Sequence, residues 1–107
     1  MWYLVLSHTQ PDKKGNIQQD HEIEHKEWLD DQHRQGKVLF SGPSSDRDYG
    51  IYIMLASNQS EAKHLAAQDP HHIRGIRTMQ VFEWDLRRAF RLDGATIADV
   101  EQMAGQR

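Results

Sequence analysis

The sequence predicts an α+β domain of the ferredoxin-like type, in which two helices cover one face of a four-stranded antiparallel sheet. Three observations lead to this fold class. Segments with strand and helix character alternate in the order βαββαβ, glycine and proline stand at the boundaries between them, and the 107 residues suit a single domain. An amphipathic stretch behind the last strand predicts an extra C-terminal helix.

The first strand and the first helix occupy the N-terminal third of the chain. Residues 2–8 are rich in aromatic and β-branched side chains, which indicates a strand, and the loop at residues 9–15 ends it. The chain is polar and helical over residues 18–35, and Gly36 is placed as the C-terminal stop of this helix. Residues 37–41 follow as the second strand.

The third strand is predicted at residues 51–56, behind a polar loop that Gly42 and Pro43 open and Gly50 closes. Its large apolar side chains point to both sides of the sheet: Ile51, Ile53 and Leu55 to one, Tyr52, Met54 and Ala56 to the other. Neither face is therefore plainly exposed to solvent. We expect a second copy of the chain to cover the face without helices, as a two-fold homodimer.

The second helix is predicted to begin at Asn58, because Glu61 stands three residues later, as a capping box requires. It should end near Asp69. The residue before a proline is disfavoured in the helical region, and Pro70 follows at once. The fourth strand is then expected at residues 76–86, after Gly75.

The last helix is expected at residues 95–104, where apolar residues recur at helical spacing. This organisation divides the chain into a domain of residues 1–86 and a C-terminal helical extension of residues 87–107. The extension would act either as a lid over a site or as an arm across a dimer, and the sequence leaves both roles open.

The amino-acid composition limits the classes of molecule that the protein is expected to bind. Thirteen basic and sixteen acidic side chains give a net charge of −3, and they are interspersed, so no basic stripe indicates binding to nucleic acid or to an anionic membrane. The chain has no cysteine, which excludes disulfides and thiolate metal sites. The opening apolar run lacks a basic lead and is too short for a signal peptide or a membrane span. We therefore expect a soluble, cytoplasmic protein whose partner is a small molecule or another copy.

One short motif, HEIEH at residues 21–25, has the spacing of a zinc-protease helix. Its context differs, because it opens a short polar helix in a chain too small for the usual two-lobed cleft. We expect no catalytic metal. An adventitious metal on His21, His25 and one of His71 or His72 is the remaining metal interpretation.

The helix that carries this motif makes a more specific prediction. At about 100° per residue, His25 lies on the same side as Trp28 and Leu29, the large apolar pair that must face the sheet. In the second helix, the buried stripe of Ala62, Leu65 and Ala66 extends to Asp69. A buried imidazole and a buried carboxylate both need partners, so we expect His25 and Asp69 to meet beneath the helices. A helix-ending aspartate and a core histidine without any function remain the alternative.

The chain also resembles the YCII family. The resemblance rests on HKEWL (25–29), FSGP (40–43), GIYIMLA (50–56), SEAKHLAAQDP (60–70), HHIRG (71–75) and VFEW (81–84). It covers about four-fifths of the chain and stops after Trp84. It implies a ferredoxin-like fold in dimers that form an α/β barrel. It also implies a histidine–aspartate dyad, which by motif falls on His25 and Asp69 here, in a family whose members of known chemistry are lyases on hydroxylated, chlorinated rings.

The chain departs from the family at two positions. Many members have an arginine shortly before the histidine, and residues 16–24 contain none; many place leucine after the histidine, where Lys26 stands. A substrate would then be anchored differently, and Arg74 and Arg77 are the candidate anchors.

Further supporting groups are predicted from their places at the strand and helix ends. The hydroxyl of Ser41 is expected to donate a hydrogen bond to a developing anion, although Ser41 would serve equally as a turn cap. His8 is a weaker candidate for the same role. Pro70 is expected to fix the backbone direction of Asp69.

These residues predict a cofactor-independent lyase or isomerase that abstracts a proton from a small organic compound, with hydroxylated aromatics among the candidates. The rival is a non-catalytic protein of the same fold that binds a small metabolite. A nucleophilic hydrolase is disfavoured, because the chain has neither cysteine nor a Gly-x-Ser-x-Gly elbow.

Overall fold

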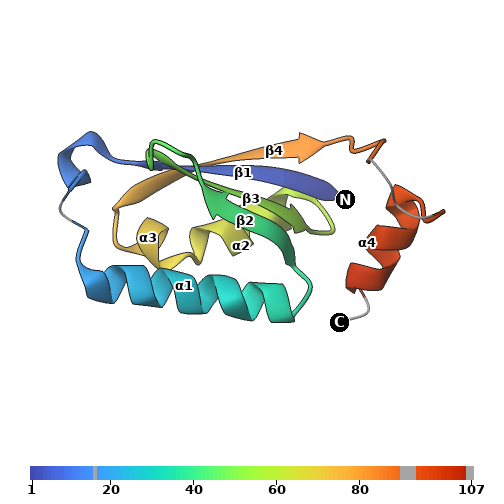
Figure 1. Cartoon of the computed structure of the whole chain (residues 1–107), viewed down its shortest axis with the longest axis horizontal. Coiled ribbons are helices and arrows are strands. Elements are labelled where there is room, and N and C mark those ends of the chain that lie inside the picture. The colour runs from blue at the N-terminus through green and yellow to red at the C-terminus, as the bar shows by residue number, and fades with distance from the viewer. Residues whose placement is uncertain (16, 90–93, 106–107) are drawn as a thin grey trace.

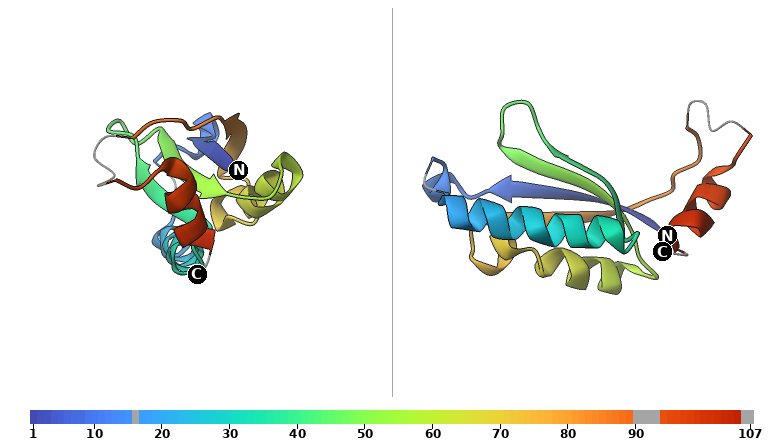
Figure 2. Two further views of the ribbon diagram at one scale, coloured as in Figure 1. Left: turned by 90° about the vertical axis from the view of Figure 1, so that its right-hand side faces the viewer. Right: turned by 60° about the horizontal axis from the view of Figure 1, so that its bottom comes forward.

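The computed structural model describes residues 1–15, 17–89 and 94–105 and contains one four-stranded antiparallel sheet of order β2-β3-β1-β4. Its elements are β1 (Trp2–Thr9), a 3-10 turn (Pro11–Lys13), α1 (Gln19–Arg34), β2 (Val38–Pro43), β3 (Tyr49–Leu55), α2 (Gln59–Ala67), α3 (Pro70–Ile73), β4 (Arg77–Trp84) and α4 (Ile97–Gly105). Helices α1, α2 and α3 lie on one side of the sheet (Figures 1 and 2). The predicted α+β, ferredoxin-like fold with an additional C-terminal helix is confirmed.

Most element ends lie within one or two residues of the prediction, and two larger differences occur. Gly42 and Pro43 do not open a loop but continue β2, paired with Ile51 and Gly50 of β3. Strand β2 lies at the edge of the sheet, where proline is tolerated because no further strand needs its missing N–H. The second difference is α3, a short helix that begins directly behind Asp69. The sequence Asp-Pro is an N-cap followed by a favoured first helical residue, so it starts a new helix after ending the old one.

The core lies between the sheet and the helices. It is formed by Tyr3, Val5, Val38, Tyr52, Met54, Ala56, Ala62, Leu65 and Ala66. The stripe predicted for the second helix is buried, and the Asn58 side chain accepts a hydrogen bond from the Glu61 N–H at 2.8 Å, so the predicted cap is present. These contacts fix the end of α2, and with it the place of Asp69.

The orientation predicted for α1 is confirmed. Trp28 and Leu29 pack against the core, whereas Ile23, on the opposite side of the helix, is 48% exposed. Gln32, one turn after Trp28, is buried. Because His25 lies one turn before Trp28 and Leu29, it too faces the sheet.

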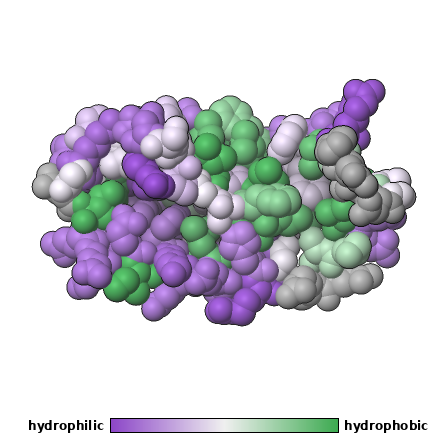
Figure 3. Space-filling view, viewed as in Figure 1, coloured by the Kyte–Doolittle hydropathy of each residue, from purple (hydrophilic) through white to green (hydrophobic). Residues whose placement is uncertain are grey.

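Within residues 1–15, 17–89 and 94–105, no helix covers the opposite side of the sheet. Its exposed large side chains are Phe40, Tyr49, Ile51, Phe82 and Trp84, which we call the open face. They belong to one side because paired residues share a side and alternate along each strand. Apolar side chains gather at the level of the sheet, above a mostly hydrophilic α1 surface (Figure 3).

Helix α4 lies at the end of the sheet where β1 begins and β4 ends (Figure 1). There the amino group of Met1 donates a hydrogen bond to Glu101 at 3.1 Å. No helix in the described part of the chain has the length and apolar character needed to cross a membrane. The division into residues 1–86 and an extension of residues 87–107 stays a prediction, and part of that extension lies outside the described residues.

Candidate functional site

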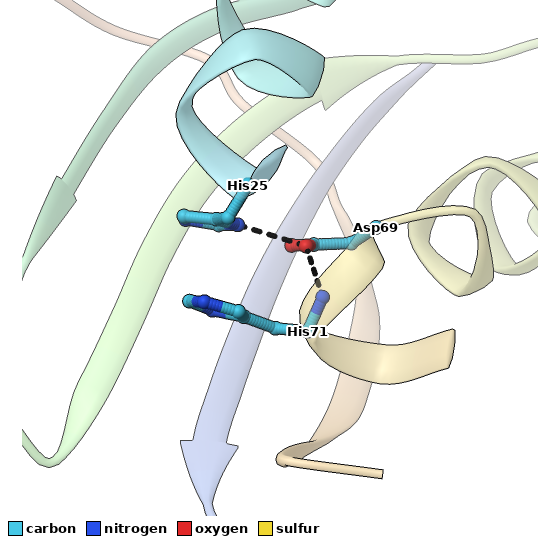
Figure 4. A group of neighbouring side chains, drawn as sticks. All are labelled: His25, Asp69 and His71. Carbon is cyan, nitrogen blue, oxygen red and sulfur yellow. Dashed lines mark hydrogen bonds and ion pairs between the residues drawn. The ribbon is translucent and has the colours of Figure 1, made fainter. Parts of the chain in front are cut away.

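A histidine from α1 and an aspartate from the start of α3 meet beneath the helices (Figure 4). His25 Nδ1 lies 2.8 Å from Asp69 Oδ1. The Asp69 side chain is fully buried, and that of His25 is 16% exposed. Since an ionised carboxylate only accepts hydrogen bonds, Nδ1 carries the proton and Nε2 is the free basic nitrogen. The expected contact is therefore present, whereas its catalytic use stays a prediction.

The position of Asp69 is fixed by local chain geometry. Its side chain caps α3, where Oδ1 also accepts a hydrogen bond from the His71 backbone N–H at 2.9 Å. Pro70 occupies the first turn of the same helix, where its ring restricts the backbone behind Asp69. Both bonds converge on one oxygen, so the carboxylate is held in a single orientation toward His25.

His71 lies under the pair, a position that the sequence did not predict. Its ring is stacked on that of His25, with centroids 4.1 Å apart and planes 7° from parallel (Figure 4). It is fully buried, and neither ring nitrogen has a hydrogen-bond partner among the described residues. Glu22 Oε1 lies 3.6 Å from Nε2. A residue two positions after an N-cap donates its N–H to that cap, and this signal could have placed His71 next to Asp69.

Burial lowers the pKa of the His71 imidazole from 6.5 to about 4, and the positive charges of His25 and Arg77 add to this shift. The unfolded chain therefore binds a proton between pH 6.5 and 4 that the folded chain does not bind. We expect the stabilisation by neutral His71 to be complete above pH 6.5 and lost as the pH falls toward 4, by up to about 3 kcal/mol.

Urea unfolding at pH 7, 5.5 and 4.5 measures this effect when wild type is compared with His71→Phe. The free energy of unfolding of the variant should fall less over this range, because phenylalanine has no proton to gain. Equal slopes for both proteins would contradict the assignment.

The pair and His71 also form the one group in the described chain whose ligand atoms lie close enough for a metal, within 4.8 Å of one another. An imidazole lone pair lies in the plane of its ring. Two parallel stacked rings therefore cannot both direct a lone pair at one ion. His21 and His72 are not members of the group. This geometry favours hydrogen bonding over metal binding.

His25 lines a pocket of about 180 Å³ between α1 and the sheet. The lining residues are Ser7, Glu22, His25, Leu29, Ser41, Gly42, Pro43, Gly50, Ile51, Tyr52 and Arg77. Pockets for drug-sized ligands typically span about 300–1,000 Å³. The pocket is thus suited to a single-ring or smaller compound. It lies at the end of the sheet opposite α4, so α4 is not a lid over this pocket of its own chain (Figure 1).

In the structure, the predicted supporting residues Ser41 and His8 lie on opposite sides of the sheet. Ser41 lines the pocket, and its Oγ forms a hydrogen bond of 2.8 Å with His33 Nε2. His8 is on the other side of the sheet, stacked on Tyr49 with ring centroids 4.6 Å apart. It faces away from the pocket because alternate residues of a strand point to opposite faces.

Arg74 is not part of the pocket lining either. Its guanidinium is held outside by Glu24, with Nε and Nη2 donating to the two carboxylate oxygens at 2.8 and 2.7 Å. Arg77, the other candidate anchor, lines the pocket. The turn between α3 and β4 thus separates the two arginines, with Arg74 outside this pocket and Arg77 in its lining.

Ser7 and Tyr52 complete the polar lining and were not predicted. Burial raises the pKa of the Tyr52 hydroxyl, and the negative charge of Asp69 raises it further. The hydroxyl therefore stays protonated and available as a donor. Register alone would have identified Ser7, since it follows Tyr3 and Val5 on the side of β1 that faces the helices.

The fold and the site define the class of protein: a ferredoxin-like domain with a paired imidazole and carboxylate beside a small pocket. The family model described as the YCII-related domain matches residues 1–85, and the chain belongs to this family. The predicted family membership is confirmed.

The chain is similar to known proteins, among them the following two. The uncharacterized protein YjpA of Bacillus subtilis (strain 168) is 30% identical over 86 residues, which cover 80% of this chain and 99% of YjpA. Among solved structures, 5-chloro-2-hydroxyhydroquinone dehydrochlorinase (TftG) from Burkholderia phenoliruptrix AC1100, in complex with 2,5-dihydroxybenzoquinone, superposes with a TM-score of 0.65 at 21% identity. That match covers 79% of this chain and 94% of TftG, and at this identity it supports the fold alone.

Proposed function

We propose that the protein is a cofactor-independent lyase or isomerase that removes a proton from a small organic substrate. The observation that carries this proposal is the 2.8 Å contact between a fully buried Asp69 and His25, whose ring lines the pocket. A buried carboxylate paired with an imidazole at a cavity is the arrangement of a general base and the group that orients it.

The roles follow from the protonation states. Asp69 accepts the Nδ1 proton and so leaves Nε2 of His25 unprotonated, as the base. When Nε2 takes a proton from substrate, the negative charge of Asp69 stabilises the imidazolium. The electron pair left on the substrate then expels a leaving group, which is a lyase reaction, or is protonated at another atom, which is an isomerisation.

We infer the class of substrate from the size of the pocket and from a similar protein of known activity. A volume of about 180 Å³ suits one ring, and TftG is a dehydrochlorinase whose structure holds a dihydroxybenzoquinone. Hydroxylated aromatic compounds are accordingly the first substrates to test.

We test proton abstraction by deuterium exchange. Ring diols, halogenated ring diols and keto acids are incubated with the protein in D₂O, and loss of the carbon-bound proton is followed by NMR. Exchange should occur with at least one compound and fall by about two to four orders of magnitude in His25→Gln. His64→Gln, a substitution on the exposed side of α2, is the matched control and should exchange like wild type.

If the protein binds a metabolite without turnover, the exchange experiment has a different expected result. It predicts ligand-induced shifts in the protein spectrum without exchange for any compound, in wild type and in His25→Gln alike. That result would remove the catalytic proposal and leave a metabolite-binding role.

We also propose a homodimer through the open face, with the sheets of two copies closing an α/β barrel. Large exposed side chains concentrated on one face support it, since a patch of this kind marks an interaction surface. A cytoplasmic location belongs to the same proposal, and the absence of cysteine suits a reducing compartment.

A further inference from the structure

Three residues that line the pocket each carry a buried polar atom without a hydrogen-bond partner in the described part of the chain. Ser7 Oγ, the Tyr52 hydroxyl and Arg77 Nε are each buried and have no hydrogen-bond partner among the described residues. Ser7 and Tyr52 are 1% and 2% exposed, and all three residues line the pocket that contains His25. Buried donors are nearly always paired in folded proteins. Three unpaired donors on residues that line one cavity favour a ligand that supplies acceptors to them.

The side chain of Arg77 indicates that this ligand is negatively charged. In the part of the chain that the structure describes, no carboxylate oxygen lies within 4.0 Å of its side-chain nitrogens, whereas Arg74 is fully engaged by Glu24. The acidic residue of the pocket lining, Glu22, has a half-exposed side chain and approaches His71 instead. The guanidinium is therefore a positive charge beside the pocket without a counter-ion among the residues that the structure describes.

The backbone opposite makes room for this side chain. A Cβ atom on Gly50 would lie 2.6 Å from Arg77 Nη1, so only glycine allows the guanidinium its place against β3. The same Cβ would be 3.6 Å from Ser7 Cβ, which puts the hydroxyl of Ser7 in the same corner of the pocket. The packing thus holds arginine and serine side by side.

We propose that Arg77, with Ser7 and Tyr52, forms an anion subsite, and that the ligand of this pocket is a small organic anion with a carboxylate or an ionised ring hydroxyl. Guanidinium binds such oxygens through short, charge-assisted and often bidentate hydrogen bonds. The inference rests on the proposed function in one respect: in an enzyme, the same groups stabilise the negative charge that appears when His25 removes a proton.

Binding measurements with matched probes test the subsite without requiring turnover. The carboxylate arm compares benzoate with neutral benzamide, and the ring-hydroxyl arm compares 4-nitrocatechol, ionised near pH 7.5, with neutral catechol. Affinities are measured by NMR titration at pH 7.5. In at least one arm the wild type should bind the anion about ten- to a hundredfold more tightly than its neutral partner.

The variants separate Arg77 from general effects of charge and folding. Arg77→Met should remove the preference for the anion, and Gly50→Ala, which keeps the arginine but displaces its flexible end, should weaken it. Arg74→Met removes a positive charge three positions earlier in the chain, outside the pocket lining, and should leave the preference unchanged. Thermal unfolding followed by circular dichroism checks that each variant is folded, and Gly50→Ala decides the test if Arg77→Met is not.

Two results would overturn the subsite: neither anion binds more tightly than its neutral partner in wild type, or the preference is as large as in wild type in folded Arg77→Met or Gly50→Ala. The outcome is separable from that of the proposed function. Arg77-dependent anion binding without deuterium exchange supports the subsite and refutes the base, whereas His25-dependent exchange without any anion preference supports the base and refutes the subsite.

Discussion

Replacing Asp69 by asparagine is expected to lower turnover by about two to four orders of magnitude while ligand affinity changes little. Asparagine has nearly the same size, and its carbonyl oxygen still accepts the hydrogen bond that the carboxylate receives from the His71 N–H. It has no negative charge, however, so it cannot stabilise the imidazolium that forms when His25 takes a proton.

This prediction is measured with the compound that exchanges fastest in D₂O, by comparing rate and dissociation constant in the two proteins. Asp31→Asn is the matched control, because Asp31 is a half-exposed aspartate on α1 whose side chain accepts hydrogen bonds from the nearby Arg34 and Gln35. Turnover within tenfold of wild type, or a large loss of affinity at unchanged turnover, would refute the role of Asp69 as the partner of the base.

Replacing Phe82 by arginine is expected to convert the protein from dimer to monomer. Phe82 is 47% exposed on the open face, where it pairs across the sheet with Leu4. An arginine there would place an unpaired charge between two apolar sheets, which costs several kcal/mol per interface and raises the dissociation constant by about a hundredfold or more.

Analytical ultracentrifugation measures this change over a range of protein concentrations. Ile23→Arg is the matched control, since Ile23 is 48% exposed but lies on the outer side of α1, away from the open face. The proposed dimer would be refuted if the wild type sediments as a monomer, or if Ile23→Arg dissociates it as strongly as Phe82→Arg.

Sequence periodicity was sufficient to predict which side chains point inward in those elements that bury one face. The orientation of α1 follows from Trp28 and Leu29, and the buried stripe of α2 leads to Asp69, so the contact between His25 and Asp69 could be predicted. Both arguments use helices, whose residues three and four apart point in one direction whatever the neighbouring elements do.

The orientation of strand residues was harder to predict, because successive side chains of a strand point to opposite faces of the sheet. His8 was chosen at the end of β1, yet its neighbour Ser7 is the residue in the pocket. Deciding between them requires the register of β1 against β3, which pairs Ser7 with Gly50. Likewise Arg74 and Arg77 are equivalent in sequence, and the turn at Gly75 between them, with φ of 69°, decides which one turns inward.

His71 escaped prediction for a different reason. The helix α2 was expected to end at Asp69 without a successor, so the residues behind it had no assigned direction. Once Asp69 is recognised as the cap of α3, the His71 N–H must point at the carboxylate and its ring comes to lie under His25.

The double use of the Asp69 carboxylate has a consequence for the dynamics of the site. An oxygen that closes the first turn of a helix cannot swing aside when a ligand arrives, unless that turn unwinds. The imidazole is consequently aligned before any substrate is present, and the molecule that enters must conform to it.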